Sequence, residues 1–516
     1  MKDQPYQRSE KQIENDKFLI FNIPFNRWIL FPCAFLVQSS LGSINSWSVF
    51  NKPIDSYIYG DQNKGRVPNG MDAIFFLLAG PFLERNGPTK GIIVGGICLA
   101  IGHYLAAIAV NTKQILILYF GYSFFSAVGN AIIYLSPIST LIKWFPDNRG
   151  LASGVAVCSV SAGNILIAQA VLPMVHAFGL IYTFIVLGSV FRGVLLALSL
   201  VYRLPPPCDK EKAPEVIDSI DIKSSGSELK TVKSETLQNE EIVLKEPNPS
   251  NVSFFQALFS NEFRMILIIF VANEMSEHIF NSHLSNMVQD IYGKNPKTAT
   301  MVVTINAAFN LFGRCFIGFL SERIGRKRTF NLLLSLSLVC FLTMTHFINN
   351  GNYNGFIAFT WIYSISYGGG FGTLPAFLSE IFRNKNIAPT HGVCMATWNL
   401  SGLIGGFVFT GIYDSLRDKG HSISDPILYN TNLYWLSAIV AFGLVVSFLI
   451  PVTVRDRKYP AVPKQILKKR LFGRIIRVIK RKRNPIEIVS KEKENEEWNN
   501  YFIQHNETLN VSIKAK

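Results

Sequence analysis

Long apolar runs separated by short polar turns dominate the sequence. A membrane-spanning helix needs roughly 20 predominantly apolar residues, and runs of about this length recur along the chain. They predict twelve helices at 28–50, 69–84, 91–110, 115–142, 151–174, 179–202, 264–288, 297–320, 328–348, 355–377, 391–413 and 432–452. The pattern therefore predicts an all-α membrane protein with twelve transmembrane helices.

One polar stretch divides the runs into two sets of six. Residues 204–251 are rich in Lys, Glu, Ser and Pro, and they carry too little apolar surface to fold alone. We predict a disordered cytosolic linker here, between an N-terminal half at 28–203 and a C-terminal half at 252–452. A cytosolic segment at 1–27 and a basic cytosolic tail at 453–516 complete the chain.

The two halves repeat each other in sequence. An offset of 238 connects six identical pairs, namely Gly80 and Gly318, Glu84 and Glu322, Arg85 and Arg323, Gly87 and Gly325, Pro137 and Pro375, and Gly154 and Gly392. A parallel repeat of this kind relates the halves by a pseudo-twofold axis along the membrane normal, with a central site between them.

Composition and charge narrow the functional class. The 516 residues are 49% hydrophobic and only 16% charged, against about 25% charged in soluble domains. The net charge of +15 is concentrated in turns, linker and tail, which predicts cytosolic N- and C-termini and argues against nucleic-acid binding. The sequence shows no metal-ligand spacing, cofactor motif, ATP motif or catalytic constellation, so we predict a secondary carrier and not an enzyme.

Two short turns carry a recurring motif. GPFLERNGPTK, from Gly80 to Lys90, and GFLSERIGRKR, from Gly318 to Arg328, match Gly-x-x-x-Asp/Glu-Arg-x-Gly-x-x-Lys/Arg, although Pro88 replaces the usual basic residue. The chain thereby resembles the major facilitator superfamily, which implies two pseudo-symmetric six-helix halves. The resemblance makes the following residues candidates for a gating loop: Gly80, Glu84, Arg85, Gly87, Gly318, Glu322, Arg323, Gly325, Arg326 and Arg328.

A narrower resemblance rests on KWFPDNRGLASG at 143–154, SWSVFNKP at 46–53 and FNLFGR at 309–314. These segments are similar to the oxalate/formate antiporter and monocarboxylate transporter families. The resemblance implies that Arg314 in the eighth span binds the substrate carboxylate. The antiporters have a second cation, a lysine, where this chain has Trp398, and its absence favours a monocarboxylate over a dicarboxylate.

Arg314 also stands out without the resemblance. It precedes Glu322 by eight residues, or about 12 Å of helix, which places its charge well inside the hydrocarbon layer. Its repeat partner is Phe76, so the charge breaks the internal symmetry. A charge at this depth faces a cavity or a partner; here either it binds substrate or it pairs with a glutamate of the seventh span.

The seventh span carries a polar stripe. Glu274, Glu277, His278 and Asn281 follow the i, i+3, i+4, i+7 spacing of one helix face. Glu274, Glu277 and His278 are candidates for a titratable relay that couples transport to a proton. The alternative is a structural role as a charge partner for Arg314 or as polar contacts between helices.

Further residues are candidates for the substrate site. The monocarboxylate resemblance places Lys52 at the binding mouth, but a lysine that simply extends its charge to the membrane interface is equally common. Polar or aromatic side chains that could line the cavity, or simply pack, are Asn310, Trp47, Tyr134, Tyr367 and Trp398. Arg192, a second intramembrane cation, lies in no recognisable motif.

The basic tail contains regularly spaced apolar residues. Residues 464–483 place Leu467, Leu471, Ile475 and Ile479 at four-residue intervals among basic residues, which predicts an amphipathic helix for the anionic cytosolic leaflet or a basic targeting segment.

The whole chain is predicted to move a small organic anion such as pyruvate, lactate or formate by alternating access, without requiring an oligomer. The alternatives are an amino acid or sugar carrier on the same fold and a non-transporting membrane sensor. The sequence does not distinguish the plasma membrane from an organelle membrane.

Overall fold

The structure is a computed structural model that describes two helical bundles and a small tail sheet. The described residues are 14, 17–18, 24–42, 50, 53–54, 57–58, 72–206, 254–382, 386–450, 459–460, 462–463, 465–471, 474–480 and 486–501. The candidates Trp47 and Lys52, and residues 207–251 of the predicted linker, lie outside them.

The N-terminal bundle is built from the first set of apolar runs. Its elements are η2 (Arg27–Ile29), α2 (Leu30–Ser39), α5 (Asp72–Thr112), α6 (Ile115–Leu118), the π-helix η3 (Tyr119–Ser126), α7 (Ala127–Trp144), α8 (Arg149–Phe178) and α9 (Leu180–Ser199). α5 contains two predicted spans, which meet at Gly87, where the backbone is not helical.

The C-terminal bundle follows the second set of runs. It consists of α10 (Phe254–Leu258), α11 (Asn261–Asp290), α12 (Pro296–Ile324), α13 (Arg326–Asn349), α14 (Tyr353–Phe382), α15 (Ile387–Asp418) and α16 (Ile427–Leu449). Eight helices among the described residues are long and apolar enough to cross a membrane. The first predicted span is described only in part, so the total of twelve stays a prediction.

The paired loop motifs share one backbone feature. Gly87 has φ +78° and its repeat partner Gly325 has φ +92°, a region that glycine enters readily and other residues avoid. In each half the glycine therefore allows the sharp reversal between two neighbouring helices, which explains why the motif requires it.

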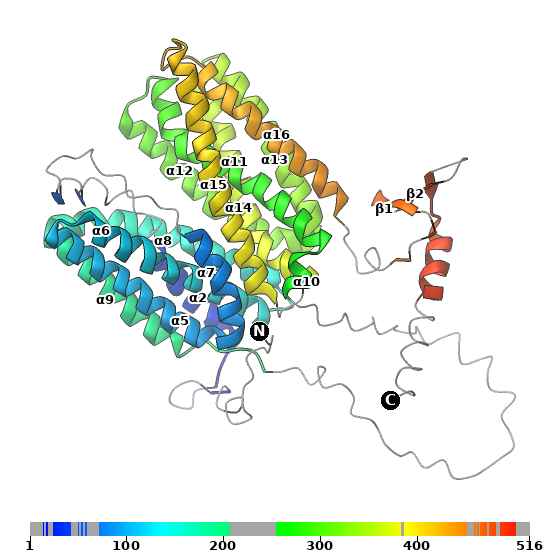
Figure 1. Ribbon diagram of the computed structural model, residues 1–516, viewed down its shortest axis with the longest axis horizontal. Helices are drawn as coiled ribbons and strands as arrows, with labels where there is room; N and C mark the ends of the chain where they lie inside the picture. The colour runs from blue at the N-terminus through cyan, green and yellow to red at the C-terminus, as the bar shows by residue number, and fades with distance from the viewer. Residues whose placement is uncertain are drawn as a thin grey trace, which may run out of the picture.

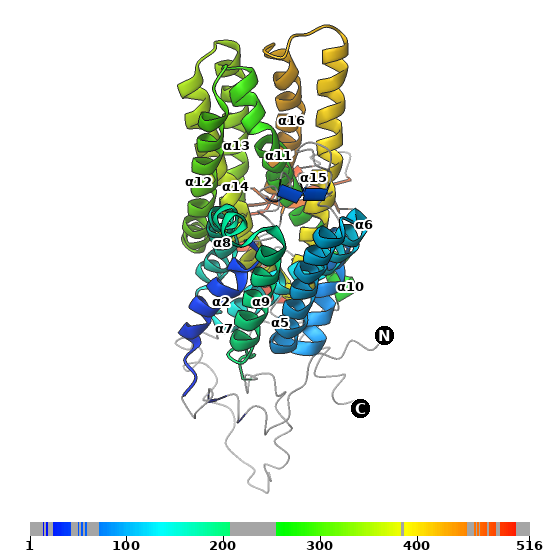
Figure 2. The same cartoon turned by 90° about the vertical axis from the view of Figure 1, so that its left-hand side faces the viewer.

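The two bundles converge at the end that carries these motifs (Figure 1). A Cβ atom built on Gly80 would lie 2.5 Å from the Cα of Pro389, and one built on Gly150 would lie 2.2 Å from the carbonyl oxygen of Gly318. Backbone thus packs on backbone between the halves at this end, which we call the loop-motif end. Figure 2 shows the same bundles from the side, with α8 beside α12 and α14.

The tail corrects one prediction. Instead of an amphipathic helix at 464–483, the structure has an antiparallel sheet of β1 (Gln465–Leu471), β2 (Arg474–Ile479) and β3 (Ile486–Ile488), followed by a helix at 491–501. Residues four apart share one face of a strand as well as of a helix, so the spacing of these apolar residues does not distinguish a strand from a helix. The β-branched composition of β2 favours the strand, and Ile475, Arg477 and Ile479 alternate as its buried positions.

Candidate binding cavity

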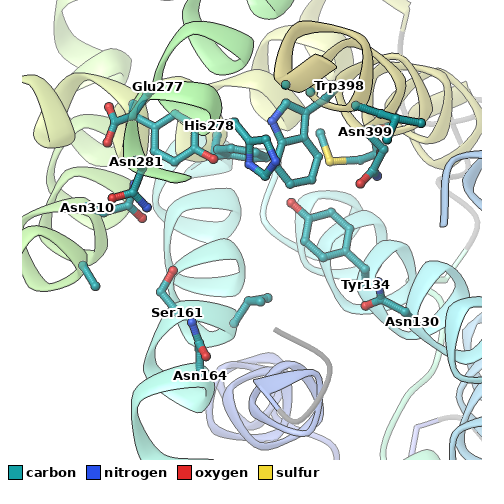
Figure 3. Close-up of a pocket in the computed structure, with 18 of the residues that line it drawn as sticks. Asn130, Tyr134, Ser161, Asn164, Glu277, His278, Asn281, Asn310, Trp398 and Asn399 are labelled. Carbon is teal, nitrogen blue, oxygen red and sulfur yellow. Dashed lines mark hydrogen bonds between the residues drawn. The ribbon is translucent and has the colours of Figure 1, made fainter. Parts of the chain in front are cut away.

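A cavity of about 800 Å³ lies between the two bundles. Side chains from α7 and α8 face it from the N-terminal half, and side chains from α11, α12, α14 and α15 face it from the C-terminal half (Figure 3). Most of the expected site residues lie together in its wall: Tyr134, Glu277, His278, Asn310, Arg314, Tyr367 and Trp398. The cavity therefore occupies the central position that the sequence repeat predicts.

Arg314 is held by neutral groups. Its Nε donates a 2.8 Å hydrogen bond to Oδ1 of Asn310, one turn earlier on α12. One terminal nitrogen donates to the carbonyl oxygen of Val157 at 3.3 Å, and the guanidinium lies 4.7 Å from the ring centre of Phe371. Within the described part of the chain, no carboxylate forms a salt bridge with Arg314. The predicted alternative, a direct ion pair to the seventh span, is therefore not the arrangement seen here.

The two glutamates of α11 have different surroundings. Glu277 lines the cavity, and its Oε1 accepts a 2.9 Å hydrogen bond from the hydroxyl of Ser364 on α14. Glu274 is fully buried and accepts a 2.8 Å bond from Asn273. Its carboxylate packs so closely on Gly370 that a Cβ atom there would clash with it. The stripe predicted from sequence thus contains one cavity-facing carboxylate and one packed between helices.

Aromatic side chains form a continuous part of the wall. Phe371 contacts Tyr367 and Trp398 edge-on, with ring centres 5.2 and 5.1 Å away. His278 lies 5.2 Å from Trp398, also edge-on. Edge-to-face contacts fix the ring orientations, so the wall around Arg314 is preorganised. Tyr134 reaches the cavity from the opposite half.

Sequence reasoning missed a set of amide and hydroxyl groups that also line the cavity. They are Asn130, Ser161, Asn164, Asn306 and Asn399. Asn306 donates a 3.0 Å hydrogen bond to Asn281, which connects α12 with α11. One signal was available, because Asn306, Asn310 and Arg314 recur every four residues and so share a face of α12.

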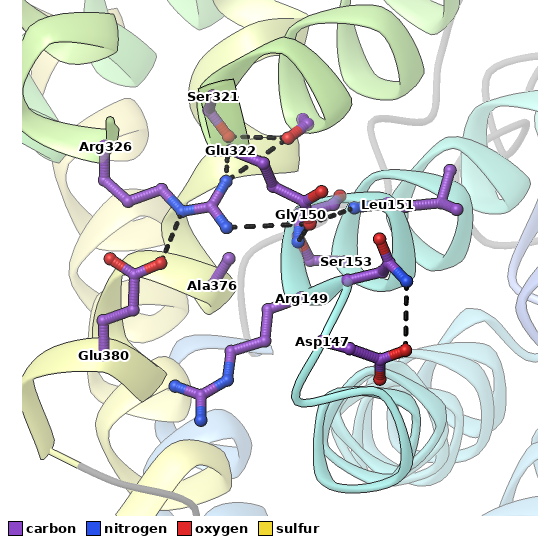
Figure 4. Close-up of polar contacts among 12 residues, drawn as sticks. Asp147, Arg149, Gly150, Leu151, Ser153, Ser321, Glu322, Arg326, Ala376 and Glu380 are labelled. Carbon is purple, nitrogen blue, oxygen red and sulfur yellow. Dashed lines mark hydrogen bonds and ion pairs between the residues drawn. The ribbon is translucent and has the colours of Figure 1, made fainter. Parts of the chain in front are cut away.

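The second loop motif joins the two halves directly (Figure 4). Oε1 of Glu322 accepts backbone hydrogen bonds from Gly150 at 2.5 Å and Leu151 at 3.2 Å, at the start of α8. Buried Arg326 donates to Oε1 of Glu380 at 2.8 Å and also to Ser321. A carboxylate at a helix N-terminus binds free N–H groups and complements the helix dipole. Glu322 therefore stabilises contact between the halves at the loop-motif end.

The first loop motif makes a different contact. Glu84 forms a salt bridge with Lys143 of the same half, at 2.8 and 2.9 Å. The equivalent glutamates Glu84 and Glu322 therefore play unequal parts. Among the motif arginines, Arg85, Arg323 and Arg328 are exposed, and Arg326 is buried. Arg192 is also exposed, on α9 and away from the cavity wall.

Comparisons with known proteins agree with this architecture. The family model of the Major Facilitator Superfamily matches residues 70–406 and 266–493. The oxalate:formate antiporter of Oxalobacter formigenes is 24% identical over 443 residues, covering 83% of this chain and 92% of the antiporter. The uncharacterized MFS-type transporter YhjX of Escherichia coli K12 is 24% identical over 377 residues, or 72% and 85% of the two chains.

Solved structures match the fold at low sequence identity. The transporter FucP in its outward conformation aligns with a TM-score of 0.56 and 14% identity, over 80% of this chain and 98% of FucP. A bacterial homologue of the iron transporter ferroportin in an outward-facing state aligns with a TM-score of 0.57 and 10% identity, over 82% and 98%.

Proposed function

The chain belongs to the major facilitator superfamily, and from this premise we propose that it carries a small organic anion, a monocarboxylate, by alternating access. As a member it is a multi-pass membrane transporter of small solutes and not an enzyme. The proposal concerns its substrate: the carboxylate binds to Arg314 in the central cavity while the two halves rock around it.

One observation carries the proposal: Arg314 lies in the cavity wall and forms no salt bridge with a carboxylate of the described residues. Its described contacts are an amide, a backbone carbonyl and an aromatic ring. None of these neutralises the charge, so an anionic solute would supply the missing partner. The planar guanidinium suits a carboxylate, because it donates two parallel hydrogen bonds, and a low surrounding dielectric strengthens the pair.

A single positive charge favours a single carboxylate. Arg314 is the only Lys or Arg among the described residues that line the cavity. A dicarboxylate such as oxalate would leave its second charge facing amides and aromatic rings, at a desolvation cost. The relative named as an oxalate:formate antiporter supports a carboxylate substrate, and the single cation selects the monocarboxylate.

The second candidate substrate is an amino acid. Glu277 lines the same cavity as Arg314, so an opposite charge is available for an ammonium group, and the asparagines offer further polar contacts. Flux into liposomes with a panel of radiolabelled monocarboxylates, dicarboxylates, amino acids and sugars separates the candidates. Binding without net or exchange flux for any solute would instead favour a non-transporting sensor.

The test of the proposal is a pair of substitutions at Arg314. Arg314→Lys keeps the charge but loses the two-donor fork, so it should retain little transport. Arg314→Gln removes the charge and should lower carboxylate flux at least about 30-fold, the effect of losing a buried charged contact worth 2 kcal/mol or more. The measurement is flux by purified protein in liposomes, with folding checked by thermal unfolding in detergent.

Arg192→Gln is the matched control, because Arg192 lies in a span but outside the cavity wall. Its flux should stay near that of the unmodified protein. If Arg314 instead served only to neutralise a glutamate, the double variants Arg314→Gln with Glu274→Gln or Glu277→Gln would regain transport. Such recovery, with unchanged substrate affinity, would contradict the anchoring role.

A further inference from the structure

Two cysteines from opposite halves meet beside the cavity. Cys158 lies on α8 and Cys315 on α12, and their sulfur atoms are 2.8 Å apart. Cys158 is buried, whereas Cys315 is half-buried. The two thiols are separated by 157 positions in the sequence, so only the packing of the two halves brings them together.

The helices that carry the thiols are in close backbone contact. A Cβ atom on Gly154 would lie 2.8 Å from the carbonyl oxygen of Arg314, and one on Gly318 would lie 3.0 Å from the Cα of Gly154. Cys158 and Cys315 lie about one helical turn further from the loop-motif end than Gly154 and Gly318 do. The halves are closed at that end in this structure, and alternating access predicts that the contact is lost when they separate there.

We propose that Cys158 and Cys315 form an oxidation site, at which a hydroperoxide converts the two thiols into a disulfide between the halves. A disulfide needs about 2.05 Å between its sulfur atoms, so the sulfurs must approach by less than about 1 Å. A small oxidant such as hydrogen peroxide suits the location, because the neighbouring residues Arg314 and Ser161 line the cavity.

The chemistry balances with one equivalent of peroxide. One thiol loses its proton and attacks hydrogen peroxide; its sulfur becomes a sulfenic acid, and the departing hydroxide takes up the proton and leaves as water. The second thiol loses its proton and attacks the sulfenic sulfur; the S–S bond forms, and the departing hydroxide takes up this proton and leaves as a second water. Two thiols are oxidised and the peroxide O–O bond is reduced; a dithiol reductant reverses the change by thiol–disulfide exchange.

The disulfide would lock the carrier. Alternating access requires the halves to separate at the loop-motif end, and a covalent bond from α8 to α12 holds them together there. Oxidation should therefore arrest transport with the cavity closed at this end. The arrest rests on the proposed transport function, but the formation of the disulfide does not, and the two are tested separately.

Cross-linking tests the site itself. A protease site is inserted between Ser224 and Glu241 of the full chain, which is then reconstituted in liposomes, treated with hydrogen peroxide and cut. On a non-reducing gel the two fragments should stay together, and dithiothreitol should separate them. Mass spectrometry should find the peptide pair that contains Cys158 and Cys315. Separation of the fragments after oxidation, or a different cysteine pair in the peptides, would overturn the proposal.

Matched serine variants make the assignment specific. Cys158→Ser and Cys315→Ser should each abolish the cross-link, whereas Cys98→Ser and Cys340→Ser should leave it intact. For a transported solute, peroxide should lower flux at least tenfold in the unmodified protein, reversibly with dithiothreitol, and have little effect on Cys158→Ser. A cross-link with undiminished flux would refute the lock while leaving the oxidation site established, and a missing cross-link would refute both.

Discussion

Glu277 is the residue best placed to couple transport to protons. It faces the cavity and its Oε1 accepts from Ser364, while its Oε2 has no hydrogen-bond partner among the described residues. Glu277→Gln, which removes the titratable proton, should flatten the pH dependence of uptake and leave exchange less affected. Glu274→Gln is the comparison, because Glu274 is packed between helices and away from the cavity wall, so it should flatten the profile less.

The measurement is initial uptake in liposomes at a series of external pH values, beside exchange at equal pH on both sides. Unaltered profiles in both variants would favour the structural role that the sequence also allowed. His278→Gln extends the series, because His278 lines the same cavity and contacts Trp398.

Charged residues of the cavity give a clear signal in the sequence, whereas most of its amides and hydroxyls give a weak one or none. Arg314 and Glu277 stand out because a charge within an apolar run is rare and costly. Asn130 and Asn164 give no comparable signal, since amides also serve as ordinary contacts between helices. Whether Glu274 or Glu277 faces the cavity depends on how α11 is rotated against α14. Packing between the helices decides this rotation. The sequence does not, because residues three apart lie on the same side of a helix.

Among the helices, the N-terminus of α8 is capped across the interface by Glu322. Charged hydrogen bonds of this kind contribute about 1.5–3 kcal/mol each, so Glu322→Gln should lower the ratio of molecules closed to molecules open at the loop-motif end at least about tenfold. Glu84→Gln is the matched control, because Glu84 pairs within its own half. Distances between spin labels on the two halves at this end measure the shift; equal shifts in both variants would contradict the asymmetry between the motifs.

An ion pair with a buried arginine connects the tail sheet to the helix that follows it. Arg477 is 1% exposed, and it donates hydrogen bonds to both carboxylate oxygens of Glu497. Arg477→Met should therefore destabilise the sheet by about 1.5–3 kcal/mol, and Lys480→Met, at an exposed position of the same segment, should not. Hydrogen exchange of peptides from 474–489, measured by mass spectrometry on the full chain, reports the difference. Unchanged protection in Arg477→Met would show that the pair contributes little.

The same pair gives the tail a pH dependence. Burial opposes ionisation of Glu497, but hydrogen bonds from Arg477 and Tyr459 outweigh it and hold the pKa of Glu497 below its usual value of 4.5. A carboxylate with a lowered pKa stabilises the fold above the unfolded-state value, and this contribution is lost as the pH falls through the folded-state pKa. Protection of the sheet should thus be complete near neutral pH and decline only below about pH 4.5.

In the whole molecule, the two halves contact each other directly at the loop-motif end. They are joined by backbone packing at Gly80 and Gly150 and by the Glu322 cap, and each half carries its own buried helices. The polar composition of 204–251 predicts no folded structure of its own.

Deleting Ser224 to Glu241 should therefore leave flux intact and change the free energy of unfolding by no more than about 0.5 kcal/mol. A Gly/Ser segment of equal length at the same place separates the effect of composition from that of length. Thermal unfolding in detergent and flux in liposomes are the measurements. Loss of folded carrier in the deletion, but not in the Gly/Ser replacement, would show that the halves need the full span of the linker to dock; loss in both would show that the linker itself contributes structure.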